Sequence, residues 1–166
     1  MHDELTPSDI KKMKEEIEYR ILTMRPKLIE EVKRTREFGD LSENFEYKEA
    51  KKNKNRNESR IRYLNNMIRT ARIVEENPDD SSIGINDIVE CYIPDMELDM
   101  TVRIVTTVRN DASKGFISKN SPFGAAIFGK SAGQTVTVDS PDGSYEVLIN
   151  KITKSNGDNA GDIAPY

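Results

Sequence analysis

The sequence predicts two units of different class: a long antiparallel helical hairpin, then a small α+β domain. Three observations support this prediction. Apolar residues recur every three or four positions through the first 76 residues, with a single reversal point at Gly39. Beyond residue 83 the apolar period falls to two, as in strands. Residues 1–76 carry 18 Lys/Arg against 16 Asp/Glu, whereas residues 77–166 carry 7 against 13, so the two halves differ in charge.

The first helix is predicted to begin at Thr6. This residue is suited to cap a helix, Pro7 to occupy its first position and Asp9 its first turn. Pro26 removes one backbone hydrogen bond, so we expect one helix that bends near residues 24–26. The seam of this helix is formed by Ile10, Ile17, Ile21, Met24, Leu28 and Val32, and Phe38 closes the run.

The second helix has the more regular repeat. Its half nearest the reversal is polar and is expected to pack loosely, whereas Leu64 and Ile68 are expected to be buried. Two such helices of about 30 residues would form a rod of about 45 Å. A spacer or a dimerisation arm would have the same pattern. The predicted seam is Tyr47, Ala50, Lys54, Asn57, Ile61, Leu64, Ile68 and Ala71.

The predicted domain boundaries follow from composition. Residues 1–76 form the hairpin, and residues 77–83 form an acidic linker broken by a proline. Residues 84–154 form the α+β domain, and the polar residues 155–166 are expected to be a disordered tail. Within the domain we expect strands at 87–93, 99–107, 134–139 and 145–153, a turn at 141–143, and a short helix that Ser121 begins and Gly129 ends.

Composition excludes several classes of protein. Hydrophobic residues make up 36% and charged residues 33%, and no apolar run approaches the roughly 20 residues of a membrane span. No signal peptide is recognisable, and Cys91 is the only cysteine, so a cytoplasmic location is expected. The one histidine, His2, lies near the terminus, and no nucleophile triad, P-loop or dinucleotide motif is present. The chain is therefore not expected to be an enzyme.

Two acidic residues lie three positions apart at the hairpin reversal, Asp40 and Glu43. The spacing is that of a helix cap, in which Asp40 or Ser42 would accept a backbone N–H and the glutamate would reach back. Alternatively, two exposed carboxylates can bind a hard cation such as Mg²⁺. Spacing alone favours the cap.

Two motifs resemble those of the bacterial GreA/GreB transcript cleavage factors. The first is Gly39-Asp40-Leu41-Ser42-Glu43-Asn44, followed by Glu46-Tyr47 and Ala50-Lys51. The second is Ser121-Pro122-Phe123-Gly124-Ala125-Ala126-Ile127-Phe128-Gly129-Lys130. Their order and separation match the family, and the resemblance extends from about residue 5 to 153. It implies that the second domain is FKBP-like, which gives the predicted fold class of a coiled-coil hairpin followed by a small FKBP-like α+β domain.

The resemblance also implies a function. Factors of this family bind bacterial RNA polymerase and insert the coiled coil through its secondary channel. Asp40 and Glu43 match the acids that hold a second Mg²⁺ there and orient the attacking water. The polymerase then cleaves backtracked RNA, so the expected partners are RNA polymerase and the nascent RNA 3′ end, with no membrane and no small-molecule substrate. Mg²⁺ is expected only in the complex and none on the chain alone.

The resemblance implies two further contact regions. The C-terminal domain would grip the rim of the channel, and its motif contributes Ser121, Pro122, Phe123, Gly124 and Lys130. An ordinary helix start with apolar core residues explains the same motif. The basic residues nearest the hairpin reversal could contact RNA or the channel, although a solvated helix face is an equal alternative. These residues are Lys51, Lys52, Lys54 and Arg56.

Two positions depart from the family pattern. The family usually has a small residue where Phe45 stands, and residues 108–112 replace its usual acidic stretch. These departures allow a different function, an inhibitor that plugs the channel without stimulating cleavage, although the retained Asp40 and Glu43 argue against it. A prolyl isomerase activity is disfavoured because the short domain lacks an evident aromatic-lined pocket.

Overall fold

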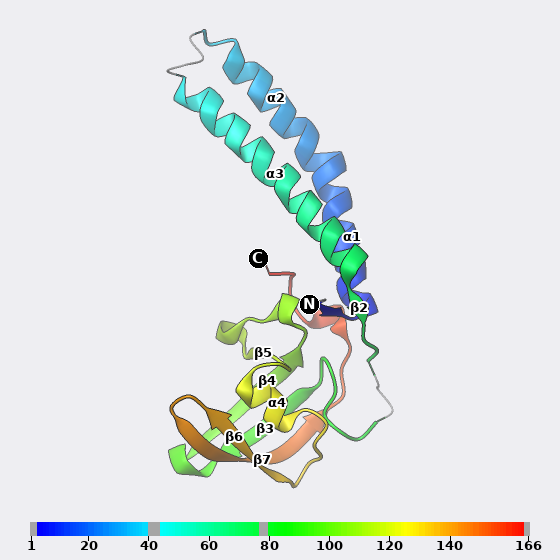
Figure 1. Cartoon of the computed structure of the whole chain (residues 1–166), viewed down its shortest axis with the longest axis vertical. Coiled ribbons are helices and arrows are strands. Elements are labelled where there is room, and N and C mark those ends of the chain that lie inside the picture. The colour runs from blue at the N-terminus through cyan, green and yellow to red at the C-terminus, as the bar shows by residue number, and fades with distance from the viewer. Residues whose placement is uncertain (1–2, 40–43, 77–79, 165–166) are drawn as a thin grey trace. The chain divides into compact units, whose positions relative to one another are not determined.

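The chain folds into two compact units, which we call the hairpin unit and the sheet unit. The hairpin unit is Ile10–Ala71, and the sheet unit combines Met1–Asp9 with Arg72–Tyr166. The structure, a computed structural model, describes residues 3–39, 44–76 and 80–164. Figure 1 shows the paired helices of the one unit and the curled sheet of the other. The predicted fold class, a helical hairpin followed by an α+β domain, is confirmed.

The hairpin has two helical arms. The first arm consists of α1 (Pro7–Tyr19), a π-helical turn (Arg20–Met24) and α2 (Arg25–Arg36), and the second is α3 (Phe45–Thr70). Two helices cannot enclose a full apolar stripe, so most predicted seam residues of the first arm are only half-buried. Ile68 is also half-buried rather than buried. The predicted register of α3 is confirmed by the buried residues Tyr47, Ala50, Asn57, Ile61 and Leu64.

The π-helical turn modifies the predicted bend at Pro26. The Arg25 N–H bonds to the carbonyl of Arg20, five residues back, instead of four. Pro26 then lies in the first turn of α2, directly after the π-helical turn. The irregularity is therefore placed over Arg20–Met24, one turn before the proline.

The start of α1 agrees with the sequence prediction. The Thr6 hydroxyl accepts the Asp9 N–H at 3.2 Å, and the Asp9 carboxylate accepts the Thr6 N–H at 3.0 Å, which is a reciprocal capping box. Just before it, β1 (Glu4–Leu5) pairs in parallel with β2 (Arg72–Ile73). The structure thus differs from the predicted boundary at residue 76, because α3 ends at Thr70 and the chain then becomes extended.

A five-stranded sheet forms most of the sheet unit. Its strand order is β5-β4-β3-β7-β6, and only the β4–β5 pair is parallel. The predicted turn at 141–143 joins β6 to β7, with Gly143 at a φ of +124° that favours glycine. The bounds are β3 (Ile88–Ile93), β4 (Leu98–Val105), β5 (Phe116–Ser118), α4 (Pro122–Ile127), β6 (Thr135–Ser140) and β7 (Gly143–Thr153).

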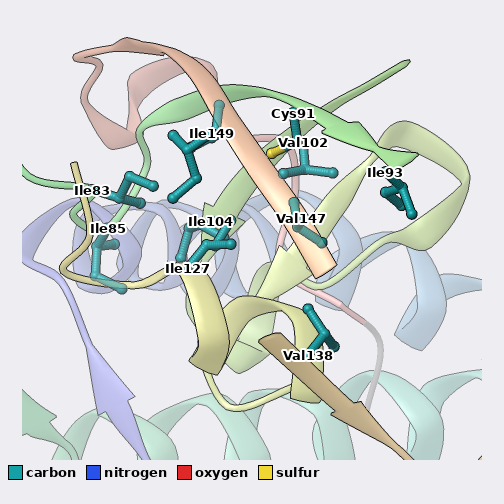
Figure 2. Close-up of a cluster of buried hydrophobic side chains, with 11 residues drawn as sticks. Ile83, Ile85, Cys91, Ile93, Val102, Ile104, Ile127, Val138, Val147 and Ile149 are labelled. Carbon is teal, nitrogen blue, oxygen red and sulfur yellow. The ribbon is translucent and has the colours of Figure 1, made fainter. Parts of the chain in front are cut away.

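One apolar cluster holds the sheet unit together (Figure 2). Ile127 of α4 is fully buried with alternate residues of β3, β4 and β7. Cys91 belongs to this cluster, and burial raises the pKa of its thiol to about 11, so it stays protonated at neutral pH. The buried members are Ile83, Ile85, Val89, Cys91, Ile93, Val102, Ile104, Ile127, Val138, Val147 and Ile149.

The tail after residue 154 differs from the prediction of disorder. Residues 157–159 form a 3₁₀ turn, and Ala160 is fully buried. Arg103 donates to the carbonyl of Asn156 at 2.5 Å, and the Ala164 N–H donates to the carbonyl of Val108 at 2.7 Å. The polar composition suggested that this segment lacks a core, but its backbone carbonyls are acceptors for buried arginines.

Candidate functional site

The apex of the hairpin lies between the end of α2 and the start of α3 (Figure 1). Gly39 has a φ of +106°, which supports its predicted role as the reversal residue. The N-cap of α3 is Asn44, whose side chain accepts the Tyr47 N–H at 3.0 Å and donates to the carbonyl of Thr35 at 2.7 Å. Asn44 therefore joins the two arms while capping one of them.

The predicted acid pair, Asp40 and Glu43, lies outside the described residues, as does Ser42. Its role in metal binding therefore stays a prediction. The alternative to metal binding was that Asp40 or Ser42 caps the second helix. The N-cap of α3 is instead Asn44. The N-cap that the acid spacing was expected to provide is supplied by a different residue.

The predicted basic residues lie along α3 behind the apex. Lys51, Lys52 and Arg56 are exposed, whereas Lys54 is half-buried at a seam position. Lys52 and Arg56 are four residues apart and share one helix face. Lys51 Nζ lies 5.4 Å from the centre of the Tyr47 ring, within cation–π range. This geometry leaves three of the four cations available to a polyanion.

Asn57 overturns one expectation about the hairpin. We expected loose packing around it, but its side chain is buried and the residue is only 2% exposed. Arg20 Nη1 donates to its Oδ1 at 3.0 Å, and its Nδ2 donates to the Arg20 carbonyl at 3.2 Å. That carbonyl belongs to the π-helical turn. The two arms are thus hydrogen-bonded where the first arm is irregular.

Ion pairs reinforce the same part of the hairpin. Glu16 accepts from Arg60 Nε at 2.9 Å and from Arg20 Nε at 2.8 Å. Burial alone would raise the pKa of Glu16, but the hydrogen bonds from Arg60 and Arg20 outweigh it and hold that pKa below its usual value. Glu58 receives two bonds from Arg25, at 2.7 and 2.9 Å. Sequence reasoning missed these pairs because only the i,i+4 spacing of Glu16 and Arg20 is visible in the sequence.

The second motif, residues 121–130, is accounted for largely by packing. Ser121 Oγ accepts the Gly124 N–H at 3.0 Å and donates to the carbonyl of Ser118 at 2.7 Å. A Cβ at Gly124 would lie 2.1 Å from that carbonyl oxygen, so only glycine fits. Phe123 packs against the core, and of the five motif residues predicted to contact a partner, Pro122 and Lys130 are exposed.

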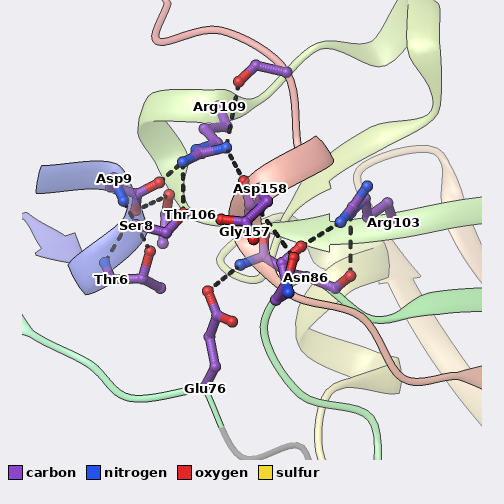
Figure 3. Close-up of polar contacts among 12 residues, drawn as sticks. Thr6, Ser8, Asp9, Glu76, Asn86, Arg103, Thr106, Arg109, Gly157 and Asp158 are labelled. Atoms are coloured by element: carbon purple, nitrogen blue, oxygen red, sulfur yellow. Dashed lines mark hydrogen bonds and ion pairs between the residues drawn. The ribbon is translucent and has the colours of Figure 1, made fainter. Parts of the chain in front are cut away.

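A buried polar network, which the sequence did not reveal, surrounds Arg109 (Figure 3). The Arg109 side chain is fully buried, and its Nε lies 2.5 Å from a carboxylate oxygen of Asp9. Its other nitrogens donate to Ser8 Oγ at 2.8 Å and to the carbonyls of Gly157 and Gly161 at 2.6 and 3.3 Å. Residues 108–112, which depart from the family pattern, therefore include a buried arginine that joins the first turn of α1 to the C-terminal tail.

The described residues meet neither of two simple criteria, one for a metal site and one for a membrane span. In residues 3–39, 44–76 and 80–164, no three His, Cys, Asp or Glu side chains gather in a way that could hold a metal. Over the same residues, no helix is long and apolar enough to cross a membrane.

Comparison with known proteins identifies the family. Residues 4–73 match the family model "Transcription elongation factor, N-terminal", and residues 77–154 match "Transcription elongation factor, GreA/GreB, C-term". The chain is 40% identical over 152 residues to transcription elongation factor GreA of Bacillus licheniformis, covering 90% of this chain and 95% of the relative. It is 35% identical over 150 residues to GreA of Bacillus subtilis, with coverage of 90% and 95%.

Among solved structures, GreA factor homolog 1 of Thermus thermophilus is 24% identical, with 92% of this chain and 99% of that chain covered and a TM-score of 0.42. The family models match both halves of the sequence, the helical hairpin with its acidic apex sequence and the α+β domain. The chain belongs to the GreA/GreB family of transcription elongation factors.

Proposed function

We propose that this chain binds bacterial RNA polymerase, carries the apex of its hairpin into the secondary channel, and stimulates cleavage of backtracked nascent RNA. The observation that carries the proposal is the match of both halves to one family, together with an apex sequence that contains two carboxylates. The named relatives are elongation factors, which does not favour the alternative of an inhibitor that only plugs the channel.

The hairpin has the properties that such insertion requires. The arms are joined at the apex by Asn44, and further back by Arg20, Asn57 and the Arg25–Glu58 pair. These contacts stiffen a two-helix rod that has little apolar core of its own. A stiff rod can deliver a side chain to a defined point, and catalysis of an in-line displacement depends on such positioning.

In this proposal Asp40 and Glu43 would hold a Mg²⁺ that is shared with the polymerase. When bound, the ion would stabilise the attacking and leaving oxygens of the phosphodiester. The chain itself would position the apex, and Lys51, Lys52, Lys54 and Arg56 would attract the phosphates of extruded RNA. The sheet unit would bind the polymerase through the surface that includes Pro122 and Lys130, with Ser121, Phe123 and Gly124 shaping that segment.

The test is a cleavage assay on reconstituted, backtracked elongation complexes. Asp40→Asn and Glu43→Gln remove the charge that Mg²⁺ requires but keep the side-chain shape, so cleavage should fall by orders of magnitude. Polymerase binding and the melting temperature should change little. Glu46→Gln is the matched control, because it removes an exposed carboxylate from the first turn of α3.

The outcomes discriminate among the candidate functions. If Asp40→Asn stimulates cleavage as well as the parent chain, the metal role is wrong. If the parent chain slows the polymerase but never stimulates cleavage, it is an inhibitor instead.

A further inference from the structure

The apex of the hairpin carries two exposed aromatic rings. Phe38 follows the end of α2 and is 56% exposed, and Phe45 is the first residue of α3 and is 81% exposed. Single exposed apolar residues are common on protein surfaces. Here, however, two phenylalanines flank the same reversal of the chain.

Each of these rings has a cation near it. The guanidinium carbon of Arg34 lies 5.2 Å from the centre of the Phe38 ring, and Lys48 Nζ lies 5.7 Å from the centre of the Phe45 ring. Tyr47 repeats the arrangement, with Lys51 Nζ at 5.4 Å, although this residue is buried. A cation beside a ring occupies at most one face of it, so the 81% exposure of Phe45 leaves much of its surface open.

The backbone holds Phe45 in place. The preceding residue, Asn44, bonds to the Tyr47 N–H on one side and to the carbonyl of Thr35 on the other. Thr35 is itself buried, and its hydroxyl donates to the carbonyl of Glu31 at 2.9 Å. The ring therefore projects from a capped helix start that is tied to the opposite arm. Its exposure follows from where the fold places it.

The chemistry of this pair selects one class of ligand. Over residues 33–52, six Lys/Arg stand against five Asp/Glu, so net charge alone attracts a polyanion only weakly. An exposed ring with an ammonium group beside it offers something more specific: a stacking surface for a base and a counter-charge for its phosphate. Further cations continue along α3 at Lys51 and Lys52.

We propose that the Phe45 ring, with Lys48 beside it, is a stacking platform for an unpaired base of RNA. The inference rests on the proposed function, which brings the apex to the extruded 3′ segment. Phe45 acts there as a positioning residue: it holds the strand beside the apex and takes no part in proton or metal chemistry. The ring stacks on any base, so the platform has little sequence preference.

The test uses backtracked elongation complexes whose extruded RNA contains 2-aminopurine, a base whose fluorescence is quenched by stacking. Fluorescence is read with the full-length chain under conditions that prevent cleavage, and cleavage is then measured separately. Phe45→Trp should keep the quenching, whereas Phe45→Ala and Phe45→Leu should lose it. Half-maximal cleavage should then require roughly 5- to 150-fold more of the Ala or Leu variant, from the usual contribution of one stacked base.

Two controls accompany these variants. Tyr19→Ala removes another exposed aromatic ring, 56% exposed on α1, and should change neither signal. Lys48→Gln should weaken both signals at low salt and matter less at high salt, because it removes only a phosphate contact. The melting temperatures of the Phe45 variants should match the parent chain, given how little of that ring is buried.

Each outcome decides the matter. If Phe45→Leu quenches and cleaves like the parent chain, the ring fills an apolar pocket of a protein partner and the stacking inference is wrong. Cleavage by the parent chain without quenching also overturns it and leaves the proposed function intact. If the parent chain quenches the fluorescence but does not stimulate cleavage, the stacking inference is supported and the proposed function is wrong.

Discussion

Replacing Arg109 by methionine should destabilise the sheet unit strongly. The Arg109 side chain is 0% and the Asp9 side chain 1% exposed, so the substitution would leave a carboxylate buried without its partner. It would also remove the donors to Ser8 and to the carbonyls of Gly157 and Gly161. Breaking one half of a buried ion pair costs about 3–5 kcal/mol. For a chain of this size the melting temperature should fall by on the order of 10 °C.

Calorimetry on the full chain measures this effect, and hydrogen exchange of the sheet amides assigns it to the sheet unit. Lys114→Met is the matched control, because its ion pair with Asp111 is exposed and 3.9 Å long, and it should leave the melting temperature unchanged. The double variant Asp9→Asn with Arg109→Met should recover part of the loss, since no buried charge remains unpaired. A loss for Arg109→Met no larger than for Lys114→Met would refute the reasoning.

Two further predictions concern the hairpin. Asn57→Ala removes two hydrogen bonds between the arms, one from a charged guanidinium, and should lower the free energy of unfolding by about 2–4 kcal/mol in thermal melts. Asn53→Ala, at an exposed position of α3, is the control and should not lower it. Equal losses for the two variants would show that the seam hydrogen bonds contribute no stability. The pKa of Glu16 lies below the usual 4.5, so its carboxylate stabilises the fold above pH 4.5. This stability is lost as the pH falls through the lowered pKa. Glu16→Gln should therefore be less stable than the parent chain near pH 7, and pH-dependent melts should show the gap close as pH falls below 4.5 and through the lowered pKa of Glu16. Glu15→Gln, on an exposed position of α1, should not show this dependence, and a gap for Glu16→Gln that persists in acid would contradict the prediction.

Features that depend on local geometry could be predicted from the sequence. The three-four spacing of apolar residues defined both arms, because a helical face repeats every 3.6 residues whatever it packs against. The period of two placed β3 and β7, and the Thr6–Asp9 spacing identified the start of α1. The family was reached differently, through the resemblance of the apex motif and the 121–130 motif to GreA/GreB factors, and the comparisons confirm it.

The tertiary structure decided which polar residues lie inside. Asn57 was expected to be a weak point of the seam and is instead hydrogen-bonded to a carbonyl of the π-helical turn. Its partner Arg20 lies 37 residues away, and no spacing rule links positions across a hairpin whose first arm is locally irregular. The same holds at the apex, where Asn44 caps α3 and also donates to the carbonyl of Thr35 on the opposite arm.

Arg109 shows the physical reason most clearly. In the sequence it belongs to a charged stretch that a solvated loop would explain equally well. In the structure it is buried against Asp9, 100 residues away, and against the backbone of a tail whose composition predicted disorder. Periodicity records how one segment divides its faces between core and solvent. Whether a buried charge is satisfied depends on which distant segments meet it, and that is set only when the whole chain has folded.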